Sequence, residues 1–303
     1  MGDTPYYSVS IDTSSRETME DGCRKIICLV RPAWPSTEIQ IKVFTDGLTN
    51  KLVGGWYQDK EDMVLVRIYG ENTDKFIDRE SEKENMKRME ESGCGSKLYA
   101  AFQNGLSYEF VHGRVLEPAL LYDPKIYREV AVCVARMHKV KISTGSASMW
   151  TFLGKLIKLY PEKFDDPVKV RTIVNHPVHI PCKMLILLQQ AMLEQHLFSH
   201  AELKEEVDYL KQRLTDIKSP LVFCHNDAMP ANMVLKSDNT IALIDLEYGG
   251  PNHAAYDLAN LFNEYIGCEE VLDYKRNYPN EFLIKDWIFS YLTEFAGQEP
   301  TKV

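Results

Sequence analysis

The sequence lacks the features that mark several large classes of protein. No stretch approaches the roughly 20 consecutive apolar residues that a helix needs to span a bilayer, so we expect no membrane insertion. Positive charge is in deficit, because 35 lysines and arginines stand against 44 aspartates and glutamates, for a net charge of −9. Nucleic-acid binding requires clustered Lys and Arg, so we expect no nucleic-acid partner. We find no internal repeat and no low-complexity segment.

Cysteines are few and scattered. The seven lie between Cys23 and Cys268, and no two have the C-x-x-C spacing of a zinc or redox site. We interpret them as reduced thiols that pack as small apolar groups. The polar N-terminus also has no apolar signal core, so the sequence predicts a cytoplasmic protein. Neither G-x-G-x-x-G nor a P-loop occurs, which removes the support for an oxidoreductase built on a dinucleotide-binding unit.

The chain contains enough apolar residues to form a large hydrophobic core. It has 303 residues, of which 45% are hydrophobic and 26% charged. This length predicts one large domain or two packed lobes. We place the boundary between an N-terminal lobe over residues 1–111, with residues 1–15 as a loose tail, and a C-terminal lobe over residues 112–303.

The N-terminal part predicts the order β-β-β-α-β-β after a first helix. The helices are recognised by an apolar stripe or by dense charge, and the strands by alternation and by the turn dipeptide Asn104-Gly105. Gly93 gives a C-cap signal for the charged helix. The predicted helices cover residues 16–30 and 74–92, and the predicted strands cover residues 39–43, 52–57, 63–69, 97–103 and 106–111.

The C-terminal part is mostly helical, with one strand and one hairpin. Asp123 and Pro124 are a good N-cap and first residue for a helix whose buried face includes Val130, Val134 and Met137. His138, at its end, is interpreted as a packed or capping histidine rather than a catalyst. Further predicted helices cover residues 149–160, 183–217, 255–265 and 282–295, with a strand at 221–224 and a hairpin of 233–236 and 241–244.

The hairpin region carries the chemistry. His225-Asn226-Asp227 follows an apolar strand, Asn232 lies five residues after Asp227, and Asp245 ends the next hairpin strand. This is the H-x-D-x-x-x-x-N spacing of a phosphotransferase catalytic loop, in which a carboxylate accepts the proton of the attacking hydroxyl and oxygen ligands hold Mg²⁺. The alternative, in which these residues only cap turns, explains any one of them but not their order.

Two N-terminal features agree with this interpretation. Arg67 stands in an apolar strand, and a buried cation requires an anionic partner, for which Glu82 is the candidate and Glu80 and Glu84 are rivals. The alternative is an edge-strand arginine in a surface ion pair. The turn over residues 45–51 offers several donors that could cover phosphates, although an ordinary hairpin turn explains it equally well; the donors are Thr49, Asn50 and Lys51.

With these residues in view, the chain resembles the choline/ethanolamine kinase family, most closely its ethanolamine kinases, from about residue 31 to about residue 292. The matching segments are FTDGLTNKL from Phe44, VLVRIYG from Val64, FQNGLSYEFVHG from Phe102, HNDAMPAN from His225 and IDLEYGGPNHAAYDLANLFNEY from Ile244. The resemblance implies an α+β, two-lobed, protein-kinase-like fold. It also implies Mg²⁺-dependent transfer of the ATP γ-phosphate to an amino-alcohol, the first step towards phosphatidylethanolamine headgroups.

The resemblance also implies a role for each matching residue. Asp227 would be the catalytic base that meets the substrate hydroxyl. Asn232 and Asp245 would be Mg²⁺ ligands, with Glu247 as a further carboxylate beside the metal. Arg67, paired with Glu82, would hold the phosphates.

The same resemblance places the two ends of the substrates. The backbone of Glu109 to Val111 would bind adenine at the hinge, and the amine would meet an aromatic and a carboxylate, which suit a cation; the amine-facing residues would be Tyr248, Glu264 and Tyr265. A primary ammonium has three N–H donors, so carboxylates favour ethanolamine, whereas a quaternary ammonium favours an aromatic cage.

Some alternatives stay open at this point. The loop residues Ala228 to Ala231 differ from the filling usual in the family, and family members usually continue through further C-terminal helices. The alternatives are therefore a choline kinase, another small-molecule kinase of the same fold, and a C-terminally truncated nucleotide-binding form without turnover. The sequence leaves the oligomeric state open, including a homodimer.

Overall fold

The chain forms two compact units. The computed structural model describes residues 4–44, 50–70, 73, 77–142, 146–160, 199–215, 217–266 and 274–298. The N-terminal unit comprises Met1–Arg114 together with Val234–Ile244, and the C-terminal unit comprises Val115–Met233 and Asp245–Val303. A hairpin late in the sequence therefore groups with the N-terminal unit, which a single boundary between residues 111 and 112 does not describe.

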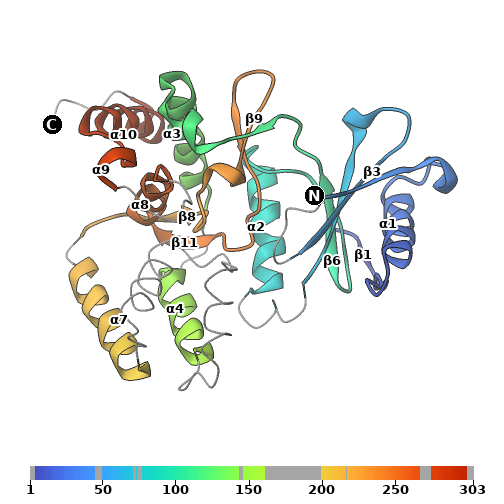
Figure 1. Ribbon diagram of the computed structural model, residues 1–303, viewed down its shortest axis with the longest axis horizontal. Helices are drawn as coiled ribbons and strands as arrows, with labels where there is room; N and C mark the ends of the chain where they lie inside the picture. The colour runs from blue at the N-terminus through green and yellow to red at the C-terminus, as the bar shows by residue number, and fades with distance from the viewer. Residues whose placement is uncertain are drawn as a thin grey trace. The chain divides into compact units, whose positions relative to one another are not determined.

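The N-terminal unit is built on a six-stranded sheet with the order β1-β5-β6-β4-β3-β2 (Figure 1). Its neighbouring strands are antiparallel except for β1, which pairs with β5 in parallel. The strands are β1 (Tyr6–Tyr7), β2 (Gln40–Phe44), β3 (Lys51–Trp56), β4 (Val64–Ile68), β5 (Leu98–Phe102) and β6 (Gly105–Glu109). The five strands predicted here are confirmed to within one or two residues.

Strand alternation decides which side chains of β4 meet which helix. Val64, Val66 and Ile68 belong to the core formed with helix α1 (Arg16–Val30). Because successive side chains point to opposite faces, Arg67 lies on the other face, where its directly paired neighbour Leu106 packs with helix α2 (Arg79–Glu91). Figure 1 shows the two helices on opposite sides of the sheet.

Helix α1 forms where the apolar stripe and its cap predict it. Ser15 accepts a hydrogen bond from the backbone of Thr18, and the Thr18 side chain accepts one from the backbone of Ser15, a capping box that satisfies two helix-end donors. Met19, Cys23, Ile26 and Ile27 are buried against the sheet. Each large apolar side chain buried in this way contributes about 1.5–3 kcal/mol.

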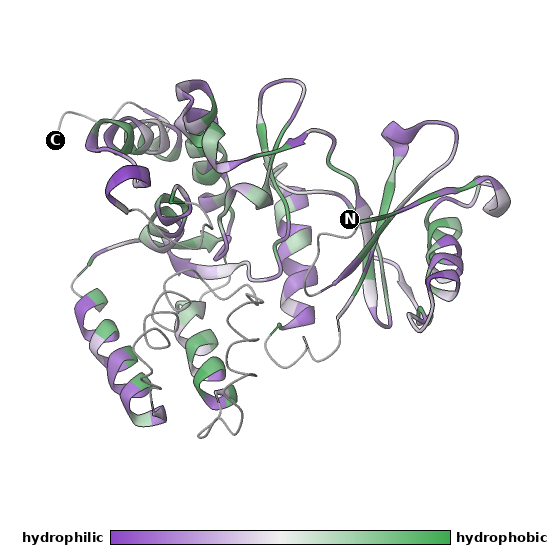
Figure 2. Cartoon of the chain, viewed as in Figure 1, coloured by the Kyte–Doolittle hydropathy of each residue, from purple (hydrophilic) through white to green (hydrophobic). Residues whose placement is uncertain are grey.

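Helix α2 begins five residues later than predicted. Asp78 accepts hydrogen bonds from the backbone N–H groups of Glu80 and Ser81, so the helix starts at Arg79 rather than at residue 74. The N-cap hydrogen bonds of Asp78 therefore fix the start of the helix, and the charged residues before it do not extend the helix towards the N-terminus. Gly93, with φ of 74°, ends the helix as predicted. Figure 2 shows α2 as mostly hydrophilic, in agreement with only a few buried positions.

We predicted a loose tail over residues 1–15, but the described part of it, residues 4–15, packs against the rest of the unit. Tyr6 and Tyr7 pair with β5, and Ile11 is buried in the α1 core. The side chain of Asn104 explains this packing, because it accepts a hydrogen bond from the Ile11 N–H and donates one to the Ile11 carbonyl, both at 2.9 Å.

The β5–β6 hairpin is confirmed, but its turn lies one residue earlier than predicted. Phe102 pairs with Gly105, so the turn residues are Gln103 and Asn104. Gly105 instead belongs to β6, where a Cβ atom would meet the Arg67 carbonyl of β4 and the ring of Phe102. The glycine is required for a close approach between strands and not for a positive φ.

The C-terminal unit is mainly helical. Helix α3 begins at Pro124 with Asp123 as its N-cap, as predicted. Of the long helical stretch predicted over residues 183–217, only residues 199–215 and 217 lie within the described part of the chain. The helices and strands are α3 (Pro124–His138), α4 (Ser148–Leu159), α7 (His200–Thr215), β8 (Leu221–Cys224), β11 (Gly250–His253), α8 (Ala254–Glu264), α9 (Tyr274–Asn277) and α10 (Glu281–Ala296).

Helices α3 and α10 pack together around aromatic side chains. Trp287 is completely buried and stacks on Tyr291, with ring centroids 5.7 Å apart, and it meets Phe262 of α8 edge to face at 5.3 Å. At the rim, Arg128 binds Asp286 at 2.8 Å. Aromatic pairs of this kind contribute about 0.5–1.5 kcal/mol beyond their burial. No helix within the described ranges has both the length and the apolar character to span a bilayer.

The remaining strands form the predicted hairpin. β9 (Met233–Leu235) and β10 (Ile241–Leu243) join β7 (Arg114–Val115) in the order β10-β9-β7. Asn239, at the turn, has φ of 65°, a conformation that asparagine tolerates better than most residues. The hairpin separates two segments of the C-terminal unit, which end at Met233 and resume at Asp245.

Gly105→Ala should destabilise the protein by about 1–3 kcal/mol, because the added methyl group has no space beside the β4 backbone. The matched control is Gly154→Ala within α4, where a Cβ atom meets nothing within 4 Å and alanine should be neutral or stabilise by up to about 1 kcal/mol. Thermal unfolding followed by circular dichroism compares the two. Equal midpoints would contradict the close approach.

Candidate active site

Two loops meet at one end of a two-stranded sheet in the C-terminal unit. β8 and β11 are antiparallel, and Cys224, the last residue of β8, pairs with Gly250, the first residue of β11. The chain that leaves β8 therefore starts beside the chain that enters β11. The first loop carries Asp227 and the second carries Asp245, and the two loops are joined by a hydrogen bond from Asn226 Nδ2 to the Tyr248 carbonyl at 2.8 Å.

The first loop folds back on its own carboxylate. Asn232 closes a short 3₁₀ turn (Pro230–Asn232), and its side-chain Nδ2 donates to the Asp227 carbonyl at 3.0 Å and to Asp227 Oδ2 at 3.1 Å. Asn260 of α8 donates to the Ala228 carbonyl at 3.4 Å. The H-x-D-x-x-x-x-N spacing thus brings the predicted base and the predicted metal ligand into direct contact.

The second loop presents further oxygen atoms. Asp245 is exposed and has φ of 61°, whereas Glu247 is buried. With Nδ2 of Asn232 bonded to Asp227, the amide oxygen remains as the ligand atom of that side chain. Carboxylate and amide oxygens are the donors that Mg²⁺ prefers, so the side chains of Asn232, Asp245 and Glu247 are of the chemical type that could hold this metal.

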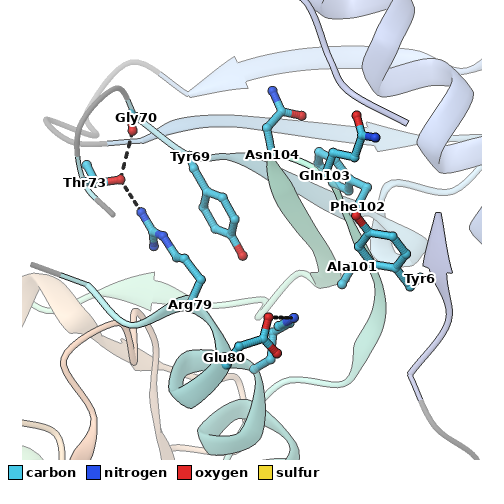
Figure 3. A pocket seen from close by; sticks show the side chains of 11 residues that line it. Tyr6, Tyr69, Gly70, Thr73, Arg79, Glu80, Ala101, Phe102, Gln103 and Asn104 are labelled. Atoms are coloured by element: carbon cyan, nitrogen blue, oxygen red, sulfur yellow. Dashed lines mark hydrogen bonds and ion pairs between the residues drawn. The ribbon is translucent and has the colours of Figure 1, made fainter. Parts of the chain in front are cut away.

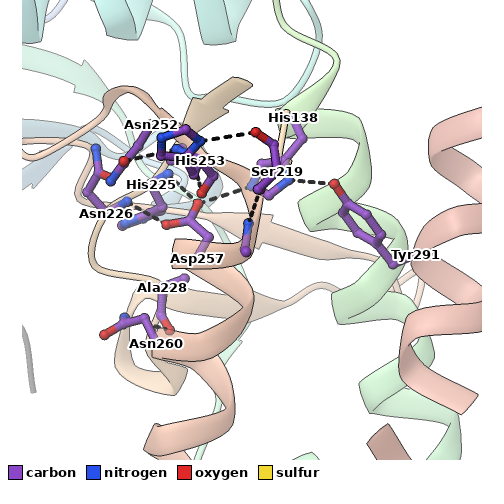
Figure 4. Close-up of polar contacts among 12 residues, drawn as sticks. His138, Ser219, His225, Asn226, Ala228, Asn252, His253, Asp257, Asn260 and Tyr291 are labelled. Carbon is purple, nitrogen blue, oxygen red and sulfur yellow. Dashed lines mark hydrogen bonds and ion pairs between the residues drawn. The ribbon is translucent and has the colours of Figure 1, made fainter. Parts of the chain in front are cut away.

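A buried carboxylate holds the first loop in place. Asp257 of α8 is fully buried and accepts hydrogen bonds from the backbone N–H groups of His225, at 2.6 Å, and Asn226, at 2.8 Å. His138 Nε2 lies 3.2 Å from the same carboxylate, and His138 Nδ1 lies 2.8 Å from the Tyr291 hydroxyl (Figure 4). A series of hydrogen bonds therefore runs from Tyr291 of α10 through His138 of α3 to Asp257 of α8, and from there to the backbone next to Asp227. The interpretation of His138 as a packed core histidine is confirmed.

This network also explains a cluster that resembles a metal site. Within the described ranges, one group of possible ligands lies close together, since atoms of His138, Cys224 and Asp257 are all within 4.8 Å of one another. Both ring nitrogens of the histidine already have hydrogen-bond partners. Burial raises the pKa of the Cys224 thiol well above its usual range, which disfavours the thiolate that binds metals. We interpret the cluster as a hydrogen-bond network.

The three residues expected to face the amine differ in their surroundings. Tyr248 is half-buried, and its ring meets Phe152 of α4 edge to face at 5.7 Å. Tyr265 is buried and packs against Tyr122, at 5.3 Å, so its ring belongs to the core of the unit. Burial raises the pKa of Glu264 to about 7, and the nearby negative charge of Asp227 adds to this effect.

In the N-terminal unit, the predicted ion pair between Arg67 and Glu82 is present. Both side chains are almost fully buried, and Glu82 also binds Arg79 at 3.0 Å. The two rival carboxylates have other partners on the surface of α2, Lys83 for Glu80 and Arg88 for Glu84. A buried carboxylate shared by two arginines satisfies the requirement that buried charges be paired.

The other predicted nucleotide-binding residues lie at strand ends of the same unit. β6 ends at Glu109, and Val111 follows in an irregular segment outside the sheet. Asn50 accepts a hydrogen bond from the Gly70 N–H at 3.3 Å, and Lys51 donates to the Thr13 carbonyl at 3.1 Å. Thr49 lies outside the described residues.

A hollow of about 390 Å³ lies beside α2 in this unit (Figure 3). It is lined by the turn between β5 and β6 and by Arg79, whose guanidinium lies 3.9 Å from the centre of the Tyr69 ring. The turn is at the opposite end of β6 from Glu109, a separation of about 13 Å for a five-residue strand. The hollow is therefore distinct from the segment expected to bind adenine.

Sequence reasoning missed the residues that support the loops. Asp257 and Tyr291 were not singled out, and Asn226 was noted only as the middle residue of the His225–Asp227 motif. Asp257 lies within the segment that carried the family resemblance, which was the available signal. Tyr291 lies in a helix with no polar motif, and no local pattern marks it as a partner of His138.

Asp257→Asn should destabilise the protein by about 2–4 kcal/mol, because an amide cannot accept hydrogen bonds at both oxygen positions and one buried N–H of the loop loses its partner. Asp238→Asn, in the exposed β9–β10 turn, is the matched control and should cost less than about 1 kcal/mol. Chemical denaturation measures both. A loss no larger than that of the control would refute the anchoring role.

Glu264 should make stability depend on pH near neutrality. Its pKa in the folded protein, about 7, is higher than the ordinary value, so the folded state favours the protonated form. This contribution is fully present below the ordinary pKa and is lost as the pH rises through 7. Between pH 5 and 8 the wild type should lose on the order of 1–2 kcal/mol more than Glu264→Gln. Parallel pH profiles of the two proteins would argue against the shift.

Comparison with known proteins assigns the chain to a family. The model of the family "Choline/ethanolamine kinase" matches residues 41–300. Ethanolamine kinase 1 of Mus musculus is 33% identical over 97% of this chain and 76% of its own length, and ethanolamine kinase 1 of Homo sapiens is 33% identical over 97% of this chain and 62% of its own.

A solved structure supports the same assignment at the level of the fold. An ethanolamine kinase of Plasmodium vivax superposes with a TM-score of 0.71 at 20% identity, covering 95% of this chain and 77% of its own. The predicted α+β, protein-kinase-like fold is therefore confirmed. Taken with the family model and the curated relatives, these findings show that the chain belongs to the choline/ethanolamine kinase family.

Proposed function

We propose that this protein transfers the γ-phosphoryl group of ATP to the hydroxyl of ethanolamine, with Mg²⁺ as the metal, in the cytoplasm. The observation that carries the proposal is the contact of Asp227 with Asn232 on the first loop, which the Asn226–Tyr248 hydrogen bond joins to the loop that carries Asp245. The curated relatives named ethanolamine kinase support the substrate. The product, phosphoethanolamine, would serve the synthesis of phosphatidylethanolamine.

Asp227 is the proposed base. Its carboxylate orients the substrate hydroxyl and accepts the proton as the oxygen attacks the phosphorus atom. The hydrogen bond from Asn232 to Oδ2 fixes the orientation of this carboxylate. Mg²⁺, held by Asn232 and Asp245 with Glu247 beside them, would neutralise the charge of the phosphates.

Residues of the N-terminal unit are proposed to hold the nucleotide. Arg67, oriented by Glu82, would contact the phosphates, and the backbone from Glu109 to Val111 would receive the adenine ring. An arginine suits this task because its planar guanidinium offers several donors to phosphate oxygens. Thr49, Asn50 and Lys51 remain candidates for covering the phosphates.

The amine is proposed to bind beside Glu264 and Tyr248. A carboxylate whose pKa is raised by burial and by Asp227 gains most from a cation placed next to it. A primary ammonium supplies three N–H donors for such carboxylates, which favours ethanolamine over choline. Tyr265 is the weakest member of the set, because its ring is already covered by Tyr122.

Steady-state phosphorylation of ethanolamine and choline, with Mg-ATP and with a chelated control, tests the proposal. We expect Mg²⁺-dependent turnover with a higher kcat/KM for ethanolamine. A higher value for choline would replace the substrate while keeping the reaction. Retained Mg-ATP binding without turnover of either amine would refute the proposed activity and support a nucleotide-binding role.

Asp227→Asn should lower kcat by about 10²–10⁴-fold, because the amide cannot accept the proton. The mutation keeps the size of the side chain, so the melting temperature and the affinity for Mg-ATP should change little. Asp238→Asn is the control for the loss of one carboxylate elsewhere, in the exposed turn of the β9–β10 hairpin. A folded Asp227→Asn protein with a near-normal kcat would exclude Asp227 as the base.

A further inference from the structure

Asn226 connects the two loops of the candidate active site. Its Nδ2 donates to the backbone carbonyl of Tyr248 at 2.8 Å and to Ser148 Oγ at 3.3 Å, and its Oδ1 accepts from Nδ2 of Asn252 at 2.7 Å. Asn226 precedes the proposed base, Tyr248 belongs to the second loop, and Asn252 lies on β11. The side-chain amide of Asn226 thus joins the loop that follows β8 to the loop that precedes β11 and to β11 itself.

The orientation of this amide is defined by its neighbours. Asn252 is fully buried, and its own Oδ1 accepts from the His253 N–H at 2.9 Å, so its Nδ2 is the atom that faces Asn226. Consequently Oδ1 of Asn226 faces Asn252, and its Nδ2 faces the carbonyl of Tyr248. Figure 4 shows the two asparagines side by side above Asp257.

The backbone at Asn226 adds a second constraint. Its φ is 66°, in the left-handed region, and its N–H donates to Asp257 at 2.8 Å. Glycine adopts this conformation at least as easily as asparagine. The conformation alone therefore does not require a side chain, whereas three side-chain hydrogen bonds do.

We propose that Asn226 is a positioning residue that fixes the Asp227 base relative to the second loop, through the Asn226–Asn252 pair and the Tyr248 carbonyl, which we call the loop clasp. In the related H-R-D motif of protein kinases an arginine occupies the middle position. Here the short, neutral side chain of Asn226 donates directly to the backbone carbonyl of Tyr248, so the two loops are joined without a charged side chain. The expected changes in kcat and KM rest on the proposed function, whereas the structural role of the clasp does not.

Loss of the loop clasp should affect kcat and the KM for the amine together. The base follows Asn226 directly, and Tyr248 is a proposed contact of the amine, so a change in their separation misaligns the hydroxyl and weakens amine binding. A misplacement of about 1 Å lowers a rate by about 10²-fold. A side chain that served stability alone would reduce only the folded fraction and leave the KM unchanged.

The test uses Asn226→Gly and Asn226→Asp in the full chain. Glycine keeps the left-handed backbone and removes the clasp, and we expect a kcat about 10–100-fold lower with a KM for ethanolamine at least threefold higher. Aspartate keeps the shape but places a carboxylate oxygen against the Tyr248 carbonyl, so its loss should be larger. Asn239→Gly and Asn239→Asp are matched controls, because Asn239 has the same backbone conformation in an exposed turn and should leave kcat and KM unchanged.

Amide hydrogen exchange of the free protein provides a readout that does not depend on turnover. Exchange over residues 245–250 should be faster in Asn226→Gly than in the wild type and in Asn239→Gly. Unchanged exchange together with wild-type kcat and KM in Asn226→Gly would overturn the proposal. If the wild type phosphorylates no amine, the proposed function fails, while faster exchange in Asn226→Gly would still support the loop clasp.

Discussion

The candidate active site depends on the buried carboxylate of Asp257. A buried anion is costly unless it accepts several hydrogen bonds, and this one binds two consecutive backbone N–H groups as well as His138. Those two N–H groups belong to His225 and Asn226, so the carboxylate fixes the direction in which the chain leaves β8. The same bonds stabilise the left-handed conformation of Asn226, which turns Asp227 towards Asn232.

Support for this carboxylate comes from distant parts of the C-terminal unit. His138 ends α3 and Tyr291 belongs to α10, and the aromatic stack of Tyr291 with Trp287 places the hydroxyl beside the histidine. The packing of α3 against α10 is therefore connected, through the side chains of His138 and Tyr291, to the loop that carries Asp227. Core packing and the geometry of the site are consequently coupled, and this coupling explains why polar groups are kept in an otherwise apolar core.

The N-terminal unit solves a similar problem with a buried ion pair. Alternation along β4 places Arg67 on the α2 face, where only a charged partner offsets the cost of removing it from water. Glu82 supplies that partner, and Arg79 shares it at 3.0 Å. The helix that carries Glu82 begins at Arg79, directly after the N-cap Asp78, so Glu82 lies in its first turn.

Several features could be predicted because their signals are local. The apolar stripe of α1, the caps at Ser15 and Asp123 and the spacing of Asp227 and Asn232 each lie within a few turns of chain. Features that depend on distant neighbours were not predictable. Asn104 marked a turn, but its side chain serves to hold Ile11, 93 residues away, so the N-terminal segment that we expected to be loose packs against the rest of the unit.

The sequence by itself determined the order of the elements and the residues of the two loops, because helix and strand periods and motif spacing are properties of short segments, and its resemblance to known proteins indicated the fold class and the family. Only the tertiary structure decided which carboxylate pairs with Arg67, that Asp257 anchors the loop that carries Asp227, and that Asn226 joins this loop to Tyr248. Each of these contacts forms between elements that are far apart in sequence. Their partners are selected by strand register and helix packing, which no local pattern encodes.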